Sequence, residues 1–269
     1  MVKVARACKY IFLIIASFLS VFPLYWMIIS ATNMNVDIIR GRLLPGTFLF
    51  QNIENLLNAA PLGQAFMNST VNALCVTVIS VLICSLAGYG FEIYHSKAKD
   101  RLMAALLVSV MVPFAAVMIP LFRLVADLGL LNTTLGFMLP MLSSAFLIML
   151  FRQSARAFPN DMIEAARIDG LSELSIFFRM FVPTMKATYA AAIVIQFLAS
   201  WNVFLWPRLI MTPGGGSITM PMLISNLIAG YLVDNGINMV AVFIASIPTI
   251  IIFFFLQRYF AEGLTGTIK

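Results

Sequence analysis

Long apolar runs separated by short polar segments dominate the hydropathy pattern of this chain. Six runs have the length of about 20 residues, with few charges, that an α-helix needs to cross the hydrocarbon core of a bilayer. The pattern therefore predicts an all-α membrane protein with six transmembrane helices in a single domain, residues 1–269. The expected spans are approximately 10–30, 68–91, 101–122, 135–151, 186–205 and 237–256.

Composition supports this interpretation. Of 269 residues, 61% are hydrophobic and 10% are charged, and the mean hydropathy is +0.98. A soluble domain has about a quarter of its residues charged, so a soluble fold is excluded. The first run is longer than the apolar core of a signal peptide, and no clean small-residue cleavage site follows it. We therefore expect it to be a membrane anchor.

The distribution of positive charge predicts the orientation. Of the 17 lysine and arginine residues, 13 lie at the two termini and in the loops after the second and fourth spans. Loops that remain in the cytoplasm carry such an excess. Both the N- and the C-terminus are therefore expected in the cytoplasm, in a multi-pass protein of the cytoplasmic membrane.

Most enzyme chemistry is absent from the sequence. There is no Gly-x4-Gly-Lys-Ser/Thr phosphate loop, and His95 is the single histidine. Cys8, Cys75 and Cys84 have neither a zinc-ligand spacing nor the pattern of a disulfide framework. We therefore expect no catalytic residues, no metal site and no cofactor in this chain.

The expected spans also lack ionisable residues near their centres. Ion-driven transporters usually keep such residues inside the membrane, so any transport by this chain is expected to draw its energy from a partner subunit. A self-contained secondary transporter or channel for a small polar solute stays open as an alternative, because some sodium sites use backbone carbonyls at broken helices.

Uncharged polar and aromatic side chains do occur in the spans, and they are candidates for a solute path. Hydroxylated solutes bind through a few hydrogen bonds and aromatic contacts, although the same residues also make ordinary hydrogen bonds between helices. The candidates are Asn72, Gln196, Ser200, Trp201 and Asn202, and Ser143 and Ser144 mark the fourth span in the same way.

The segment EAARIDGLSELSIFFRMFVP, which starts at Glu164, is a charged cytoplasmic loop between two apolar spans. Asn160 or Asp161 can cap a helix that runs to about Asp169, and Gly170 can end it with a positive φ. Ser172 can cap a second helix, 173–181, which ends before a proline. The loop is therefore predicted to be two short helices joined at a glycine corner.

The two helices are expected to face different surroundings. Leu174, Phe177, Phe178 and Phe181 recur at helical spacing, so they should form an apolar face against the membrane helices. The first helix combines Ile163, Ala165 and Ala166 with charges of both signs. A lipid-binding helix would be more uniformly basic, so this pattern favours a protein partner.

This stretch resembles the cytoplasmic EAA loop of permease subunits of ABC importers. That pattern is Glu-Ala-Ala, three residues, Gly, nine residues, Ile, one residue, Leu-Pro. The chain has Glu164, Ala165, Ala166 and Gly170 in place, with methionine and valine as conservative replacements for Ile and Leu. The segments LGLLNTTLG, WNVFLWP and QRYFAEGLTGTIK are similar to the second permease subunit of carbohydrate importers of the maltose and glycerol-phosphate type.

The resemblance implies a type I ABC importer permease fold, in a bacterial or archaeal membrane. The EAA loop, 160–183, would contain a coupling helix, and Asp169 would join the four residues above in contacting an ATPase. The implied partners are a homologous second permease, two ATP-binding subunits that carry ATP and magnesium, an extracytoplasmic solute-binding protein and membrane lipid, without nucleic acid. The resemblance also implies binding-protein contacts in the third outer loop, at Pro213, Gly214, Gly215 and Gly216.

Overall fold

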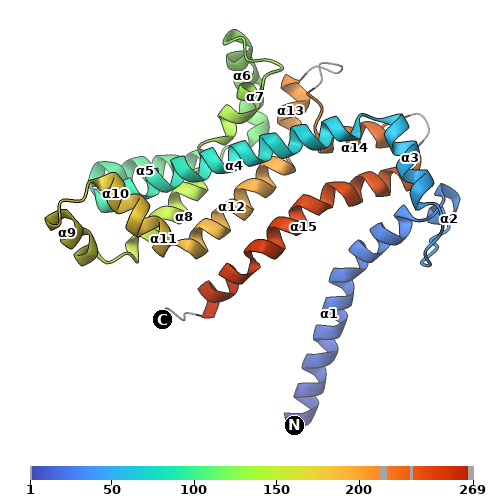
Figure 1. Cartoon of the computed structure of the whole chain (residues 1–269), viewed down its shortest axis with the longest axis horizontal. Helices are drawn as coiled ribbons and strands as arrows, with labels where there is room; N and C mark the ends of the chain where they lie inside the picture. Colours follow the sequence, from blue (N-terminus) through green and yellow to red (C-terminus); the bar gives the residue numbers. More distant parts are fainter. Residues whose placement is uncertain (1, 212–216, 231–232, 266–269) are drawn as a thin grey trace. The chain divides into compact units, whose positions relative to one another are not determined.

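The computed structural model describes residues 2–211, 217–230 and 233–265, and every regular element in these ranges is a helix (Figure 1). The chain forms two compact units. The first comprises Met1–Ala65 and Met220–Pro248, and the second comprises Phe66–Thr219 and Thr249–Lys269. Two of the three boundaries between the units fall inside long helices, α4 (Leu62–Ile93) and α15 (Asn235–Thr265), and the third lies between Thr219 and Met220.

The first unit contains the N-terminal helix and the short helices that follow it. Asn52 donates to the carbonyl oxygens of Ala31 and Asn33, at 3.0 and 2.9 Å. These carbonyls lie at and beyond the C-terminus of the first helix, where no helical donor is available. One buried asparagine therefore joins two helices of this unit. Its helices are α1 (Val2–Ala31), α2 (Asn35–Ile39), α3 (Leu49–Ala59), α14 (Met220–Ile228) and the first part of α15.

The second unit carries the two sites described below. It contains most of α4, the end of α15, α5 (Lys97–Ser109), α6 (Phe114–Asp127), α7 (Thr134–Met138), η1 (Leu139–Met141), α8 (Ala145–Arg156), α9 (Asn160–Ile168), α10 (Glu173–Ile176), η2 (Phe177–Phe181), α11 (Val182–Thr184), α12 (Lys186–Trp201) and α13 (Leu205–Ile210). Helix α8 packs against both α5 and α12. Phe151 of α8 is fully buried there, and the hydroxyl groups of Ser154 and Thr188 lie 2.8 Å apart between α8 and α12.

Within the described ranges, four helices are long and apolar enough to cross a membrane, and two bent helix pairs raise the number to six. The bent pairs are α5 with α6, at 101°, and α7 and η1 with α8, at 49°. They coincide with the spans expected at 101–122 and 135–151, for which the sequence indicated continuous helices. The structure corrects that expectation, because each of these helices is interrupted.

Both interruptions have a local cause. Pro113 has an extended backbone, and a proline also disfavours the helical conformation of the residue before it, so α5 ends and α6 starts anew. Ser144 is also extended, and its hydroxyl accepts a hydrogen bond at 3.3 Å from the amide of Leu147 in the first turn of α8. Such a cap marks a helix start.

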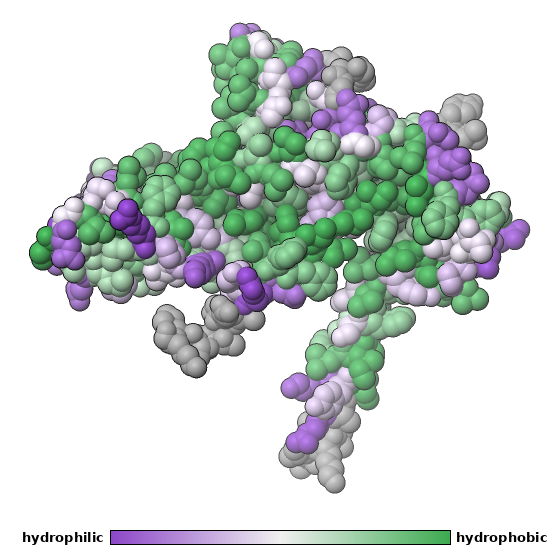
Figure 2. Space-filling view, in the orientation of Figure 1, coloured by the Kyte–Doolittle hydropathy of each residue, from purple (hydrophilic) through white to green (hydrophobic). Residues whose placement is uncertain are grey.

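Hydrophobic side chains cover much of the visible surface along α4 and α12, whereas polar and charged side chains mix with them around α9 and α10 (Figure 2). Leu74, Val78 and Leu82 are exposed along α4. Exposed apolar surface of this extent is typical of helices that contact lipid or another membrane subunit.

Candidate functional site

Helix α9 begins at Asn160, directly after Pro159. Pro159 occupies the capping position, and no side chain caps the helix, so the expected capping role of Asn160 or Asp161 is wrong. Both residues instead lie in the first turn. The carboxylate of Asp161 is there close to the positive end of the helix dipole, as the sequence predicted.

A glycine ends α9. Gly170 has φ +79°, its amide donates to Arg167, and the amide of Leu171 donates to Ala166 at 3.0 Å. These two bonds form a Schellman motif, which satisfies carbonyls at the helix end. Ser172 then caps α10 by accepting from the amide of Ser175. We call residues 159–176 the α9–α10 corner. The structure agrees with the expected glycine stop and serine cap.

The helix after the corner does not have the predicted face. Residues 177–181 form a π-helical turn, which has an extra residue compared with an α-helical turn. The buried side chains are Ile176, Phe177 and Phe181, whereas Leu174 is 63% exposed and Phe178 is 49% exposed. The expected apolar face is therefore wrong for Leu174 and Phe178, which are exposed, and right for Phe177 and Phe181, which are buried.

Helix α9 has an inner and an outer face. Ile163 and Ala166 are buried in a cluster that also contains Ala155, Phe158, Ile176, Phe177 and Phe181. Of the residues expected to contact a partner, Glu164, Ala165, Asp169 and Gly170 are exposed, and Ala166 faces the cluster.

Sequence reasoning missed two exposed apolar residues on α9. Ile168 is 86% exposed and Met162 is 41% exposed. With Ala165 between them at intervals of three, they form an apolar strip on the outer face. The signal was their spacing relative to Ala165, but the sequence alone does not distinguish a strip that faces outward from one that faces the core.

An ion pair crosses the α9–α10 corner. Arg167 Nε donates to Glu173 Oε1 at 2.7 Å, and the ring of Tyr94 lies beside the guanidinium group. The Arg167 guanidinium lowers the pKa of Glu173. The ion pair therefore stabilises the corner at neutral pH, and this stabilisation is lost when acidification through the lowered pKa protonates Glu173.

A second charged cluster joins three helices next to the corner. Arg152 of α8 is buried, and it donates to Glu92 Oε2 at 3.0 Å and to Asp100 Oδ1. Arg156 also donates to Glu92, at 3.3 Å, from a half-exposed position. The cluster fixes the end of α4 and the start of α5 to α8, and α8 leads directly into α9.

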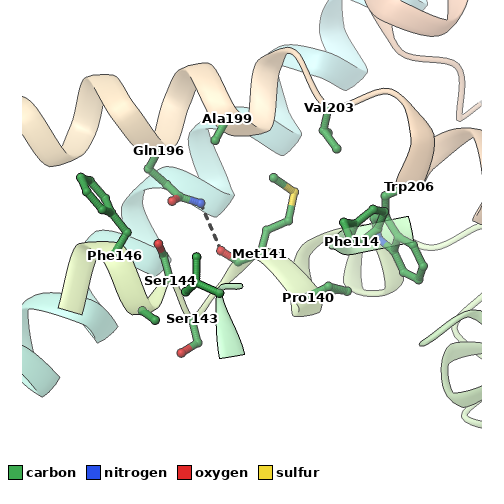
Figure 3. Close-up of a pocket in the computed structure, with 12 residues that line it drawn as sticks. Phe114, Pro140, Met141, Ser143, Ser144, Phe146, Gln196, Ala199, Val203 and Trp206 are labelled. Atoms are coloured by element: carbon green, nitrogen blue, oxygen red, sulfur yellow. Dashed lines mark hydrogen bonds between the residues drawn. The ribbon is translucent and has the colours of Figure 1, made fainter. Parts of the chain in front are cut away.

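A pocket of about 470 Å³ lies where the two bent helix pairs are interrupted (Figure 3). Gln196 of α12 donates to the carbonyl oxygen of Met141 at 3.1 Å, and the Phe114 ring meets the Trp206 ring edge-on. The pocket thus combines an apolar wall with a few polar groups, as small-molecule sites do. Its lining is Val110, Phe114, Pro140, Met141, Ser143, Ser144, Ala145, Phe146, Gln196, Ala199, Val203 and Trp206.

The structure brings one of the five expected solute-path residues, Gln196, to this pocket. Asn72 lines a separate polar pocket of about 120 Å³. Ser200 is buried, Trp201 is buried and stacks on Phe197, and Asn202 is exposed and bonds to its own helix. The expected contacts at Pro213, Gly214, Gly215 and Gly216 lie outside the described residues.

Phe114 and Met141 are pocket residues that the sequence analysis did not select. Each looks like an ordinary membrane-facing side chain in a hydropathy profile. The available signal was the nearby prolines, Pro113 and Pro140, because interrupted helices leave backbone groups free near a binding site.

Comparison with known proteins decides the family. A family model described as binding-protein-dependent transport system inner membrane component matches residues 80–266, more than half of the chain. The chain belongs to this family. It is therefore a multi-pass membrane component of a transport system, as the EAA resemblance predicted.

Two relatives extend over nearly the whole of this permease. The lactose transport system permease protein of Rhizobium radiobacter is 45% identical over 261 residues, covering 97% of this chain and 95% of the relative. The arabinooligosaccharides transport system permease protein of Bacillus subtilis (strain 168) is 35% identical over 276 residues, covering 99% and 97%.

A solved structure has the same fold as this permease. A chain in the crystal structure of a bacterial ABC transporter involved in the import of the acidic polysaccharide alginate matches with a TM-score of 0.85. It is 20% identical, and the match covers 96% of this chain and 97% of the other. At this identity the likeness shows the fold, and it confirms the predicted all-α permease fold.

Proposed function

We propose that this permease is one of two membrane subunits of an ATP-driven importer of a neutral carbohydrate. The α9–α10 corner would dock on a cytoplasmic ATPase, and a homologous second permease would complete the translocation path. Two ATPase subunits would bind ATP and magnesium, and an extracytoplasmic binding protein would deliver the solute. In this arrangement both termini lie in the cytoplasm.

The outer face of α9 is the observation that carries the docking role. Ala165 and Ile168 are exposed beside Glu164 and Asp169, while Ile163 and Ala166 hold the helix against the core. A short helix that is rigidly seated on one side, and apolar but charge-flanked on the other, fits an apolar groove with a polar rim. Its position in the chain is that of the EAA loop.

The pocket supports a neutral solute. Among the described residues that line it, none is ionisable. A sugar phosphate or an acidic sugar would need cationic partners, because an unpaired charge is costly to bury. The relatives named above include permeases for lactose and for arabinooligosaccharides, and both substrates are uncharged.

The docking role predicts the effect of Ile168→Asp. The side chain is almost fully exposed, so the change should alter the free energy of unfolding by less than about 0.5 kcal/mol. The purified complex should nevertheless lose its ATPase subunits and its solute-stimulated ATP hydrolysis, because a charge would enter an apolar contact. Co-purification and an ATPase assay measure this.

The matched control is Leu128→Asp, the same change at an exposed leucine at the end of α6, away from the corner. It should retain the ATPases. If Ile168→Asp keeps normal ATPase content and hydrolysis, the docking role is wrong. Solute flux through this chain alone, driven by an ion gradient, would instead establish a self-contained transporter.

The pocket predicts a different effect for Gln196→Leu. Loss of the amide should reduce solute uptake into proteoliposomes by about tenfold, since a pocket built around a polar group discriminates through it. ATPase content should not change, because Gln196 lies in α12 and away from the corner. Ser200→Ala, at a buried serine outside the pocket lining, should leave uptake close to that of the parent protein.

A further inference from the structure

The connection between α4 and α5 lies against the α9–α10 corner through the ring of Tyr94. Two cations lie near this ring: Lys99 Nζ is 5.2 Å from the ring centroid, and Arg167 Cζ is 6.0 Å from it. Lys99 comes from the first turn of α5 and Arg167 from the last turn of α9. One aromatic ring therefore contacts cations from two separate helices.

Both cations are held in place by further bonds. Lys99 Nζ donates to the carbonyl oxygens of Gly90 and Tyr94, at 2.9 and 2.6 Å, and so closes the end of α4. Arg167 is held by Glu173 across the corner. Burial raises the pKa of the Tyr94 hydroxyl, and so does the negative charge of the nearby Glu173. The ring between the two cations therefore belongs to a neutral phenol.

The α4–α5 connection is also fixed on its other side. Asp100, one residue after Lys99, accepts from the buried Arg152 of α8, and Glu92 at the end of α4 accepts from the same guanidinium group. The corner is joined covalently to α8 before it and, through the residues that follow it, to α12. Its buried residues also pack in one cluster with Tyr89 of α4. Tyr94 adds a contact with the α4–α5 connection.

We propose that Tyr94 is a positioning residue that makes the α4–α5 connection move together with the α9–α10 corner. This inference rests on the proposed function, in which the ATPases displace the corner. The displacement then reaches α5 through Tyr94, in addition to α8 and α12 through the chain and α4 through Tyr89. The bend between α5 and α6 borders the pocket, and it lies at the C-terminal end of α5, whereas Lys99 lies at the N-terminal end.

The test compares Tyr94→Leu with Tyr94→Phe in the purified complex. Leucine keeps an apolar side chain and removes the aromatic face, whereas phenylalanine keeps the face and removes the hydroxyl. Tyr259→Leu is the matched control, because it removes another tyrosine–arginine contact, with Arg258 at 4.8 Å, in the last helix. All three variants are made in the full chain with its partner subunits.

Two measurements decide the proposal. In Tyr94→Leu, amide hydrogen exchange of residues 97–101 and 160–171 should become about tenfold faster. Local opening of these segments then costs less free energy, because there are no ring contacts to break. The number of solute molecules transported per ATP hydrolysed should fall several-fold while the ATPases stay bound. Tyr94→Phe should retain most of the parent values, and Tyr259→Leu should retain all of them.

Unchanged exchange in Tyr94→Leu would overturn the link, and faster exchange with an unchanged transport ratio would overturn its role in coupling. A transport ratio that falls equally in Tyr94→Phe would show that the hydroxyl, and not the aromatic face, is the contact, which also overturns the proposal. If the parent chain itself retains no ATPase, the proposed function has failed. The exchange measurement on the chain alone still decides whether Tyr94 links the two segments.

Discussion

Gly88→Ala should destabilise the second unit by about 3 kcal/mol, at the upper end of the range for overpacked sites. A Cβ atom at this position would lie 2.6 Å from Phe151 Cβ, 2.7 Å from the amide nitrogen of Arg152 and 2.8 Å from the carbonyl oxygen of Ile148. Two of these are backbone atoms of α8. The added methyl group can therefore be accommodated only if α4 and α8 separate, since small residues are what permit such close helix contacts.

Gly90 provides the matched control on the same helix. A Cβ atom there meets no other atom within 4 Å. Gly90→Ala should therefore stabilise the protein by up to about 1 kcal/mol through helix propensity alone. The midpoints of thermal unfolding in detergent should fall for the first variant and rise slightly for the second. Equal midpoints would show that the α4–α8 contact is looser than the structure indicates.

Local signals explain why the corner could be predicted from the sequence. Gly170 and Ser172 act within one helical turn, so the glycine stop and the serine cap followed from residue type and spacing. The spans were predictable for a similar reason, because bilayer thickness sets the length of each apolar run. The capping of α9 was misassigned, because a proline takes the position that asparagine or aspartate could have filled.

The features that the sequence did not predict depend on contacts between segments distant in the chain. The π turn brings both Phe177 and Phe181 against Tyr89 of α4, with ring centroids 5.3 and 5.0 Å away, and α-helical periodicity contains no information about that. Gly88 has no local signature either, because its role exists only beside α8. The interruption of the spans was partly predictable. Pro113 is a local signal for a helix break, but hydropathy averaged over a whole span does not register a single proline.

Arg152→Met should have the second large effect, a loss of about 2–4 kcal/mol, because it removes the buried cation that joins two carboxylates. Glu92 retains the half-exposed Arg156 and Asp100 retains the exposed His95, and such surface pairs contribute little. Methionine approximates the length of the aliphatic part of the side chain, so the packing of α8 is largely kept. Glu92 at the end of α4 and Asp100 at the start of α5 would then lose the buried cation that contacts both of them. Thermal unfolding in detergent at neutral pH measures the loss.

Two further variants separate charge pairing from packing. Arg156→Met removes the half-exposed arginine on the same carboxylate and should cost less than about 1 kcal/mol, as surface pairs do. Adding Glu92→Gln and Asp100→Asn to Arg152→Met should recover part of the stability, because the two negative charges that the buried cation neutralised are then removed with it. No recovery in this triple variant would mean that Arg152 acts through the shape of its side chain. The charged cluster would then be a consequence of the α4–α5–α8 arrangement and not its cause.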